Sequence, residues 1–222
     1  MKSLSADFLL ENVRLAHQSR RESAFSADVP EDVFLNYVLP YVNLNEDRER
    51  WRQDFYDRYF SLSQKSADAG AAAERLNELF IKDFELKYDI DKRPQPDQSP
   101  YQTIAVKVAS CTGLSILYSD ILRSVGIPAR VVGTPQWTDK SGNHTWVEVW
   151  SKGQWHHLGA GEEGGLNEAW FNEKASQADP EIPEHRIYAA SFKRTDMLFP
   201  TIWDPFVDYV FATDVTQRYL KP

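Results

Sequence analysis

Two residues that together support nucleophilic catalysis stand 33 positions apart in this chain. Cys111, the single cysteine, lies between a serine and a threonine in SCTGLSILYSDILRSVGIPAR, and His144 opens the segment HTWVEVW. A thiolate attacks carbonyl carbon, and a nearby imidazole can take the thiol proton and return it to a leaving group. Taken singly, a cysteine is more often a small buried residue and a strand histidine an ordinary polar residue. Only the pair predicts chemistry.

The segment around Cys111 has the marks of a buried helix that begins at the cysteine. Ser110 suits the N-cap position, Gly126 suits the end of the helix, and Pro128 prevents its continuation. Apolar residues recur at helical spacing at Leu114, Leu117, Ile121, Leu122 and Val125. Cys111 is therefore expected at the positive end of a helix, where free N–H groups favour a thiolate and can bind an oxyanion.

His144 is expected on a strand of a β-hairpin. HTWVEVW alternates, SKGQ has turn residues, and WHHLGA returns antiparallel. The simplest register pairs Trp150 with Trp155 and Glu148 with His157. Continued, it pairs Trp146 with Gly159, so that Gly159 lies diagonal to His144 on the same face.

These motifs resemble the transglutaminase-like superfamily of papain-like thiol enzymes. The likeness rests on a cysteine that opens a helix, on LRSVGIPARVVG, and on a strand that begins NHTWVEVW. The likeness covers roughly residues 100–160. Within this range the sequence is similar in type to a branch of bacterial transglutaminase-domain proteins that are often exported and multidomain. The likeness implies an α+β fold in which the helix bearing the cysteine packs on an antiparallel sheet. It also implies that Cys111 is the nucleophile and His144 the base.

The sequence departs from the family at the third catalytic position. The family places an aspartate a few residues after the tryptophan of the return strand, and that position is Gly159 here. Glu162 is the nearest acid downstream, and in a regular strand it would face away from His144. A bulge in GAG would turn Glu162 back toward His144, because glycine accepts the backbone angles that a bulge needs. We therefore expect Glu162 to orient the imidazole, with His157, or an asparagine or aspartate in the connection 129–143, as weaker alternatives.

Tryptophans near the hairpin are candidates for the walls of a substrate cleft, with ordinary core packing as the alternative. Trp137 precedes His144 in the polar loop PQWTDKSGN, and Trp146 shares the face of His144. We expect both to contact substrate. No metal site or cofactor is expected: His156 and His157 point to opposite faces of a strand, and GAGEEGG lacks the pattern of a nucleotide loop.

The whole chain sets the remaining limits. A formal net charge of −8 over 222 residues, without a dense basic run, argues against nucleic acid as the partner. No apolar run is long enough for a transmembrane helix. We expect a helical N-terminal region at 1–95 and a catalytic core at 96–222. The compartment stays open, with export from a longer precursor as one alternative, and a β-rich domain following the core is expected partly from the resemblance.

Two functions follow from this sequence. The first is a thiol-dependent amide hydrolase or acyl transferase that forms a thioester on Cys111 and acts on a peptide or protein, with water favoured as the acceptor. The second is a transglutaminase-like binding module that has lost activity, which Gly159 suggests.

Overall fold

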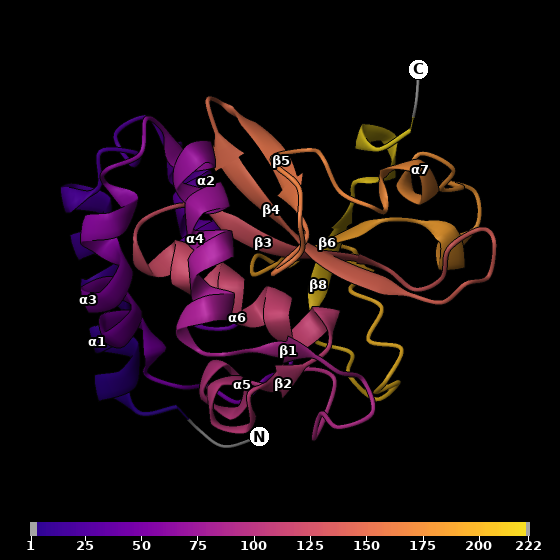
Figure 1. Cartoon of the computed structure of the whole chain (residues 1–222), viewed down its shortest axis with the longest axis horizontal. Helices are drawn as coiled ribbons and strands as arrows, with labels where there is room; N and C mark the ends of the chain where they lie inside the picture. The colour runs from indigo at the N-terminus through magenta and orange to yellow at the C-terminus, as the bar shows by residue number, and fades with distance from the viewer. Residues whose placement is uncertain (1–3, 221–222) are drawn as a thin grey trace.

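The computed structural model describes residues 4–220 and shows an α+β fold (Figure 1). Its helices are α1 (Ala6–Glu22), α2 (Glu31–Tyr37), α3 (Trp51–Ser63), α4 (Ala69–Asp83), α5 (Pro100–Val106), α6 (Cys111–Ser124) and α7 (Asn172–Ala175). Its larger sheet contains β3 (Ala129–Thr134), β4 (His144–Ser151), β5 (Gln154–Leu158), β6 (Tyr188–Ser191), β7 (Met197–Leu198) and β8 (Phe211–Asp214). A parallel pair, β1 (Lys87–Tyr88) and β2 (Val108–Ala109), precedes α6.

Helix α6 is the centre of the molecule. Every residue from Cys111 to Ser124 is buried, so the helix is covered on all sides and not only along its apolar stripe. Arg123, near its end, donates to the carbonyls of Ala129 and Val42, whereas the buried hydroxyls of Ser115 and Ser119 have no hydrogen-bond partner among residues 4–220. The helix ends at Ser124, and Gly126 two residues later has a φ of +85°, the left-handed conformation that glycine adopts most easily and that terminates a helix.

The main core lies between α6, the sheet and two N-terminal helices. It joins Tyr59 of α3, Leu76 and Phe80 of α4, Leu117 of α6 and Val147 of β4. The helices α3 and α4 gather on one side of α6 and the sheet extends from the other (Figure 1). The predicted division between 1–95 and 96–222 remains a prediction, and this core runs across it.

The larger sheet is antiparallel, with strand order β5-β4-β3-β6-β8-β7. The hairpin register is as the sequence indicated, because Trp150 pairs with Trp155 and Glu148 with His157. Its two-residue turn has positive φ at both Lys152 and Gly153, as a type I′ turn requires. The ladder stops at Leu158, so the expected pairing of Trp146 with Gly159 is not part of it.

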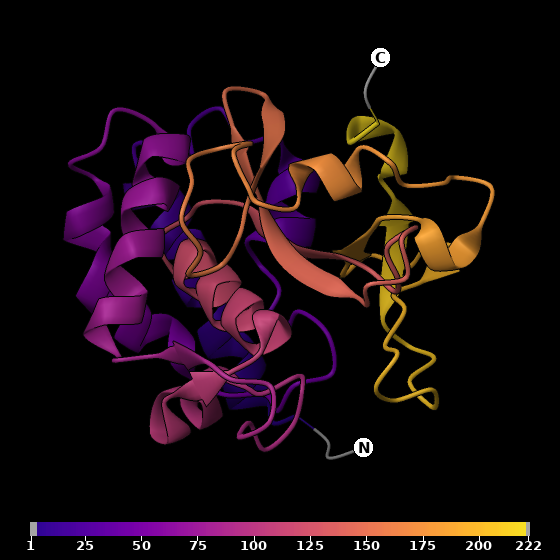
Figure 2. The same cartoon turned by 45° about the vertical axis from the view of Figure 1, so that its right-hand side comes forward.

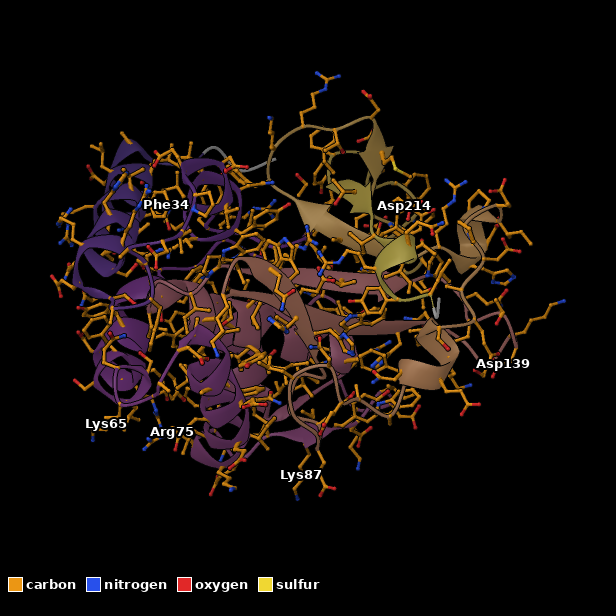
Figure 3. All side chains as sticks on the ribbon, turned by 90° about the horizontal axis from the view of Figure 1, so that it is seen from above. Phe34, Lys65, Arg75, Lys87, Asp139 and Asp214 are labelled. Carbon is orange, nitrogen blue, oxygen red and sulfur yellow. The ribbon has the colours of Figure 1, made fainter. Side chains whose placement is uncertain are left out.

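The turned view shows the β3–β4 strands passing across α6 toward the C-terminal strands (Figure 2). In the view from above, Asp139 of the loop between β3 and β4 lies at the opposite side of the molecule from Lys65 and Arg75 of the helical layer (Figure 3). The tip of the loop that leads into β4 therefore lies away from Lys65 and Arg75. Among residues 4–220, no helix is long and apolar enough to cross a membrane.

Candidate active site

Cys111 is the first residue of α6 and is 9% exposed. Ser110 holds the N-cap position as predicted, but its hydroxyl donates to the carbonyl of Pro96 at 3.3 Å and makes no bond to a helical N–H group. The prediction that the side chain of Ser110 caps the helix is therefore wrong. The helix start is instead tied to β4 through the hydroxyls of Thr112 and Thr145, 3.1 Å apart. This contact holds the cysteine next to the first residues of the histidine strand.

His144 begins β4 and is 5% exposed. Aromatic rings surround its imidazole: the centroid of Phe171 lies at 5.0 Å, that of Trp170 at 4.9 Å and that of Trp137 at 6.2 Å. These rings restrict the positions open to the imidazole and exclude water from much of it. They come from loops on both sides of the strand, so the site is assembled from segments far apart in sequence.

A cavity of about 560 Å³ brings the candidate residues together. Cys111, His144 and Glu162 all line it. Its other walls come from three aromatic residues, one leucine, and small or polar residues: Tyr88, Leu114, Trp137, Ser141, Asn143, Ala160, Gly161, Trp170 and Lys174. The volume is in the range of binding sites for small molecules or a few side chains of a peptide.

Glu162 approaches the imidazole as the sequence analysis expected. Its Oε1 lies 3.4 Å from Nε2 of His144. The chain reaches this point by a four-residue turn, closed by the N–H of Glu162 on the carbonyl of Gly159 at 3.2 Å, with Gly161 at φ +71°. The expected bulge is therefore wrong and a turn replaces it, because the β5 ladder has already ended at Leu158.

Gly159 leaves space that the Glu162 carboxylate occupies. A Cβ added at Gly159 would lie 2.0 Å from Oε2 and 2.6 Å from Cδ of Glu162. Any side chain at 159 would have to displace that carboxylate. The glycine at the expected aspartate position and the glutamate three residues later thus belong to one arrangement, in which the acid enters from a different backbone position.

Asn77 of α4 fastens this turn to the helical layer. Its amide donates to the carbonyl of Gly159 at 2.9 Å, and its oxygen accepts from the N–H of Gly161 at 2.8 Å. The side chain is 4% exposed, so both bonds lie away from solvent. A residue from an N-terminal helix therefore fixes the position of the candidate triad acid.

We expect Asn77→Ala to destabilise the protein by about 1–3 kcal/mol, because two buried backbone groups lose their partners. It should also lower acylation of Cys111 about tenfold or more, since Glu162 is no longer held beside His144. Urea unfolding and the acylation rate measure the two effects. Asn77→Asp is the matched control, because it keeps the acceptor for the N–H of Gly161. Its stability and its acylation rate should lie between those of wild type and Asn77→Ala. A loss of stability with full acylation would contradict this account of the turn.

The two tryptophans that were predicted to line the cleft lie in different layers. Trp137 is in the cavity wall. Trp146 is fully buried, and it stacks on Trp137 with the ring centroids 6.0 Å apart. Its indole donates to the hydroxyl of Tyr219 at 2.8 Å. Trp146 therefore supports the wall from behind, which corrects the expectation that it contacts substrate. The alternation of the strand predicted correctly that Trp146 shares a face with His144, but it did not predict that Trp146 is fully buried.

The other two histidines of the hairpin are engaged outside the cavity. Nε2 of His157 lies 2.8 Å from Oδ1 of Asn172, and Nδ1 of His156 lies 2.9 Å from Nδ2 of Asn167. His157 is thus held away from the role of orienting His144. Within residues 4–220 no cluster of three histidine, cysteine or acidic side chains is placed to hold a metal.

Burial dominates the protonation of all three candidate catalytic groups. It raises the pKa of the Cys111 thiol, while the N–H groups of Thr145 and Thr112 lower it by less. Burial lowers the pKa of His144 to about 4. It raises the pKa of Glu162 to about 7, against a smaller lowering by the Trp170 indole.

Near neutral pH the free site therefore holds a thiol beside a neutral imidazole. No hydrogen bond between the sulfur and the imidazole is found among residues 4–220. The sequence favoured a thiolate, because Cys111 stands at a helix N-terminus. That expectation is corrected here, since the desolvation of the sulfur outweighs the N–H groups that face it.

The family model for the transglutaminase-like superfamily matches residues 59–160. This chain carries a transglutaminase-like domain. The matched segment runs from α3 through the Cys111 helix and the His144 strand to the turn that precedes Glu162. The α+β fold, with the cysteine helix packed on an antiparallel sheet, is the fold that the sequence predicted.

Solved structures similar to the transglutaminase-like chain share little sequence with it. A protein of Cytophaga hutchinsonii provisionally described as a cysteine protease is 18% identical, with a TM-score of 0.41 over 65% of this chain and 48% of that one. LapG of Legionella pneumophila is 14% identical, with a TM-score of 0.42 over 84% of each chain. A protein described as a TGase is 12% identical, with a TM-score of 0.35 over 82% of this chain and 50% of that one. This chain spans about half the length of the Cytophaga protein.

No curated protein matches the sequence. At these sequence identities and TM-scores, the solved structures do not show which activity this chain has. The function is therefore inferred from the residues of the transglutaminase-like domain and their geometry.

Sequence reasoning missed two aromatic residues of the cavity. Trp170 is 57% exposed and packs over the His144 ring, and Tyr88 is 62% exposed on β1. Neither lies in the hairpin or in the helix that carry the motifs. An isolated tryptophan in EAWFNE and an isolated tyrosine in ELKYDI carry no local signal of a site. Only the folded chain brings them to the cavity.

Proposed function

We propose that this protein transfers acyl groups through a thioester on Cys111. The observation that supports it most is the cavity shared by Cys111, His144 and Glu162, in which the Glu162 carboxylate occupies the space left by Gly159 beside the His144 ring. A nucleophile at a helix start, a base on the neighbouring strand and an acid behind the base are the groups that amide acyl transfer requires.

The proposed reaction begins when Cys111 Sγ attacks an amide carbonyl as His144 accepts the thiol proton. The tetrahedral intermediate then loses the amine, to which His144 returns the proton, and the thioester remains on Sγ. Water or a second amine attacks this thioester with His144 as the base, and the acyl group leaves as an acid or a new amide. Because both the thiol and the imidazole start neutral, proton transfer accompanies attack and no thiolate needs to exist beforehand.

We propose a peptide or protein as the substrate and water as the usual acceptor. The cavity is open to solvent and lined by Trp137, Trp170 and Tyr88, which suits a flexible chain held by aromatic contacts. In this proposal Glu162 orients the imidazole, and Trp137 contacts the substrate. The alternative is a transglutaminase-like binding module, which would use the same aromatic cavity without forming a thioester.

The proposal is tested with p-nitrophenyl acetate, a small ester that acylates cysteine nucleophiles whatever their natural substrate. We expect a burst of p-nitrophenolate stoichiometric with protein and an acetyl group on the tryptic peptide that contains Cys111, detected by mass spectrometry. Cys111→Ala should give neither. The adduct should decay in water, and faster decay with added glycine ethyl ester would identify an acyl transferase. A wild-type protein without an adduct at Cys111 would refute the proposal and favour the binding module.

A further inference from the structure

Tyr88 is held next to the start of α6 by a small parallel sheet. In the β1–β2 pair Tyr88 lies opposite Ala109, two residues before Cys111. The N–H of Asp89 donates to the carbonyl of Ala109 at 3.0 Å, and the N–H of Lys87 donates to that of Lys107 at 3.0 Å. Both Figure 1 and Figure 2 show this pair close to α5 and to one end of α6. The backbone of Tyr88 is therefore fixed relative to the nucleophile.

The side chain of Tyr88 lines the same cavity as Cys111 and Glu162. Burial raises the pKa of its hydroxyl, and negative charge on Cys111 and on Glu162 raises it further, against a lowering by Arg93. The hydroxyl therefore keeps its proton, and it lies within the electrostatic reach of both groups. It is a donor in the cavity where negative charge develops during acyl transfer.

The Tyr88 hydroxyl differs from three tyrosine hydroxyls that are bonded within the protein. Those of Tyr118 and Tyr188 donate to backbone carbonyls at 2.6 Å and 2.8 Å, and that of Tyr219 donates to Glu148 at 2.8 Å. Among residues 4–220, no hydrogen bond from the Tyr88 hydroxyl to a protein acceptor is found. Its donor is thus free for a ligand in the cavity.

Acyl transfer at Cys111 creates a specific need for such a donor. Attack turns the carbonyl oxygen into an oxyanion, and donors that meet it lower the barrier. The N–H groups of Thr112 and Thr145 lower the pKa of the Cys111 thiol, so they act on the sulfur before attack. The N–H of Cys111, in the first turn of α6, lacks an intrahelical acceptor and can serve the oxyanion. With this N–H alone, the oxyanion would have a single hydrogen-bond donor.

We propose that the Tyr88 hydroxyl donates a hydrogen bond to the oxyanion formed on attack by Cys111, as the second donor beside the Cys111 N–H. This inference rests on the proposed acyl transfer at the same site. The thiol proton goes to His144 on attack, and Tyr88 keeps its own proton throughout. Tyr88 is thus a catalytic residue supplied by β1, outside the helix and the hairpin that carry the nucleophile and the base.

The test compares two reactions of Cys111 in wild type and in Tyr88→Phe. Acylation by p-nitrophenyl acetate passes through an oxyanion, whereas alkylation by iodoacetamide displaces iodide at a saturated carbon and forms none. We expect Tyr88→Phe to slow acylation about 10²-fold and to leave the alkylation rate unchanged. The ring remains in place, so an aromatic wall that only contacts the ligand would not produce this split.

Tyr209→Phe is the matched control, because its hydroxyl contacts Asn45 and the residue is not part of the cavity wall. Both rates should stay at the wild-type value in this variant. Equal acylation in Tyr88→Phe and wild type would overturn the inference, and so would an equal fall of acylation and alkylation, which would show a structural disturbance. A wild-type protein that is not acylated at Cys111 would instead remove the proposed function itself, so the two failures are distinguishable.

Discussion

Replacing Cys111 by alanine is expected to lower acyl transfer on the order of 10⁴-fold or more, and replacing His144 as well should cost little further. The reason is that a nucleophile and its base act as one unit: without either of them, the other has no partner in the proton transfer. The structure makes this a demanding test, because no hydrogen bond joins the sulfur and the imidazole in the free site among residues 4–220.

Cys111→Ala, His144→Ala and the double variant are to be compared by steady-state hydrolysis of p-nitrophenyl acetate. His157→Ala serves as the control, because that ring is bonded to Asn172 and should leave turnover near the wild-type rate. Additive losses in the double variant would mean that the two residues act independently. In that case the catalytic pair proposed here does not exist, whatever their shared cavity.

Glu162→Gln is expected to lower turnover by about 10²–10⁴-fold, because an amide orients the imidazole poorly and cannot stabilise its charged form. The pKa of Glu162 is raised to about 7, so the carboxylate is present above that pH and lost as pH falls through it. Wild-type turnover should therefore decline below about pH 7, and Glu162→Gln should lack this decline. A wild-type rate that rises on acidification through pH 7 would contradict the assignment.

The same substitution should affect stability in the opposite direction. A carboxyl whose pKa is raised by folding stabilises the folded state least at high pH, where its buried charge is uncompensated. At pH 8 the melting temperature of Glu162→Gln should exceed that of wild type, and the difference should shrink as pH falls through 7 and vanish below about pH 4.5. Glu163→Gln, a neighbouring exposed acid, should change neither turnover nor melting temperature.

Gly159 and Glu162 should behave as an exchangeable pair. Gly159→Asp alone places its Cβ within 2.0 Å of Oε2 of Glu162, so we expect it to lose activity. Gly159→Asp combined with Glu162→Ala removes the collision, and Gly159 is outside the left-handed φ region that would exclude aspartate. The double variant should exceed both single variants in turnover, and an additive loss would show that the two positions do not share one role.

The local sequence determined the elements that carry the nucleophile and the base. Apolar spacing, Ser110 and Gly126 defined the helix that begins at Cys111, and alternation with a Lys152–Gly153 turn defined the hairpin and its register. These features depend on residues a few positions apart, so backbone geometry and periodicity suffice to predict them. The superfamily resemblance rested on the same two segments, and the family match includes both.

The tertiary structure decided what these elements meet. Glu162 reaches His144 because Asn77, more than eighty residues earlier in the chain, fastens a turn that the local sequence suggested only as a bulge. Trp146 lies behind the cavity wall because Tyr219 and Trp137 cover it. The alternation of a strand specifies which face a side chain lies on, but how deeply that side chain is buried depends on the segments that pack against the face. The thiol and imidazole are neutral for the same reason, since their burial results from loops that no local pattern places.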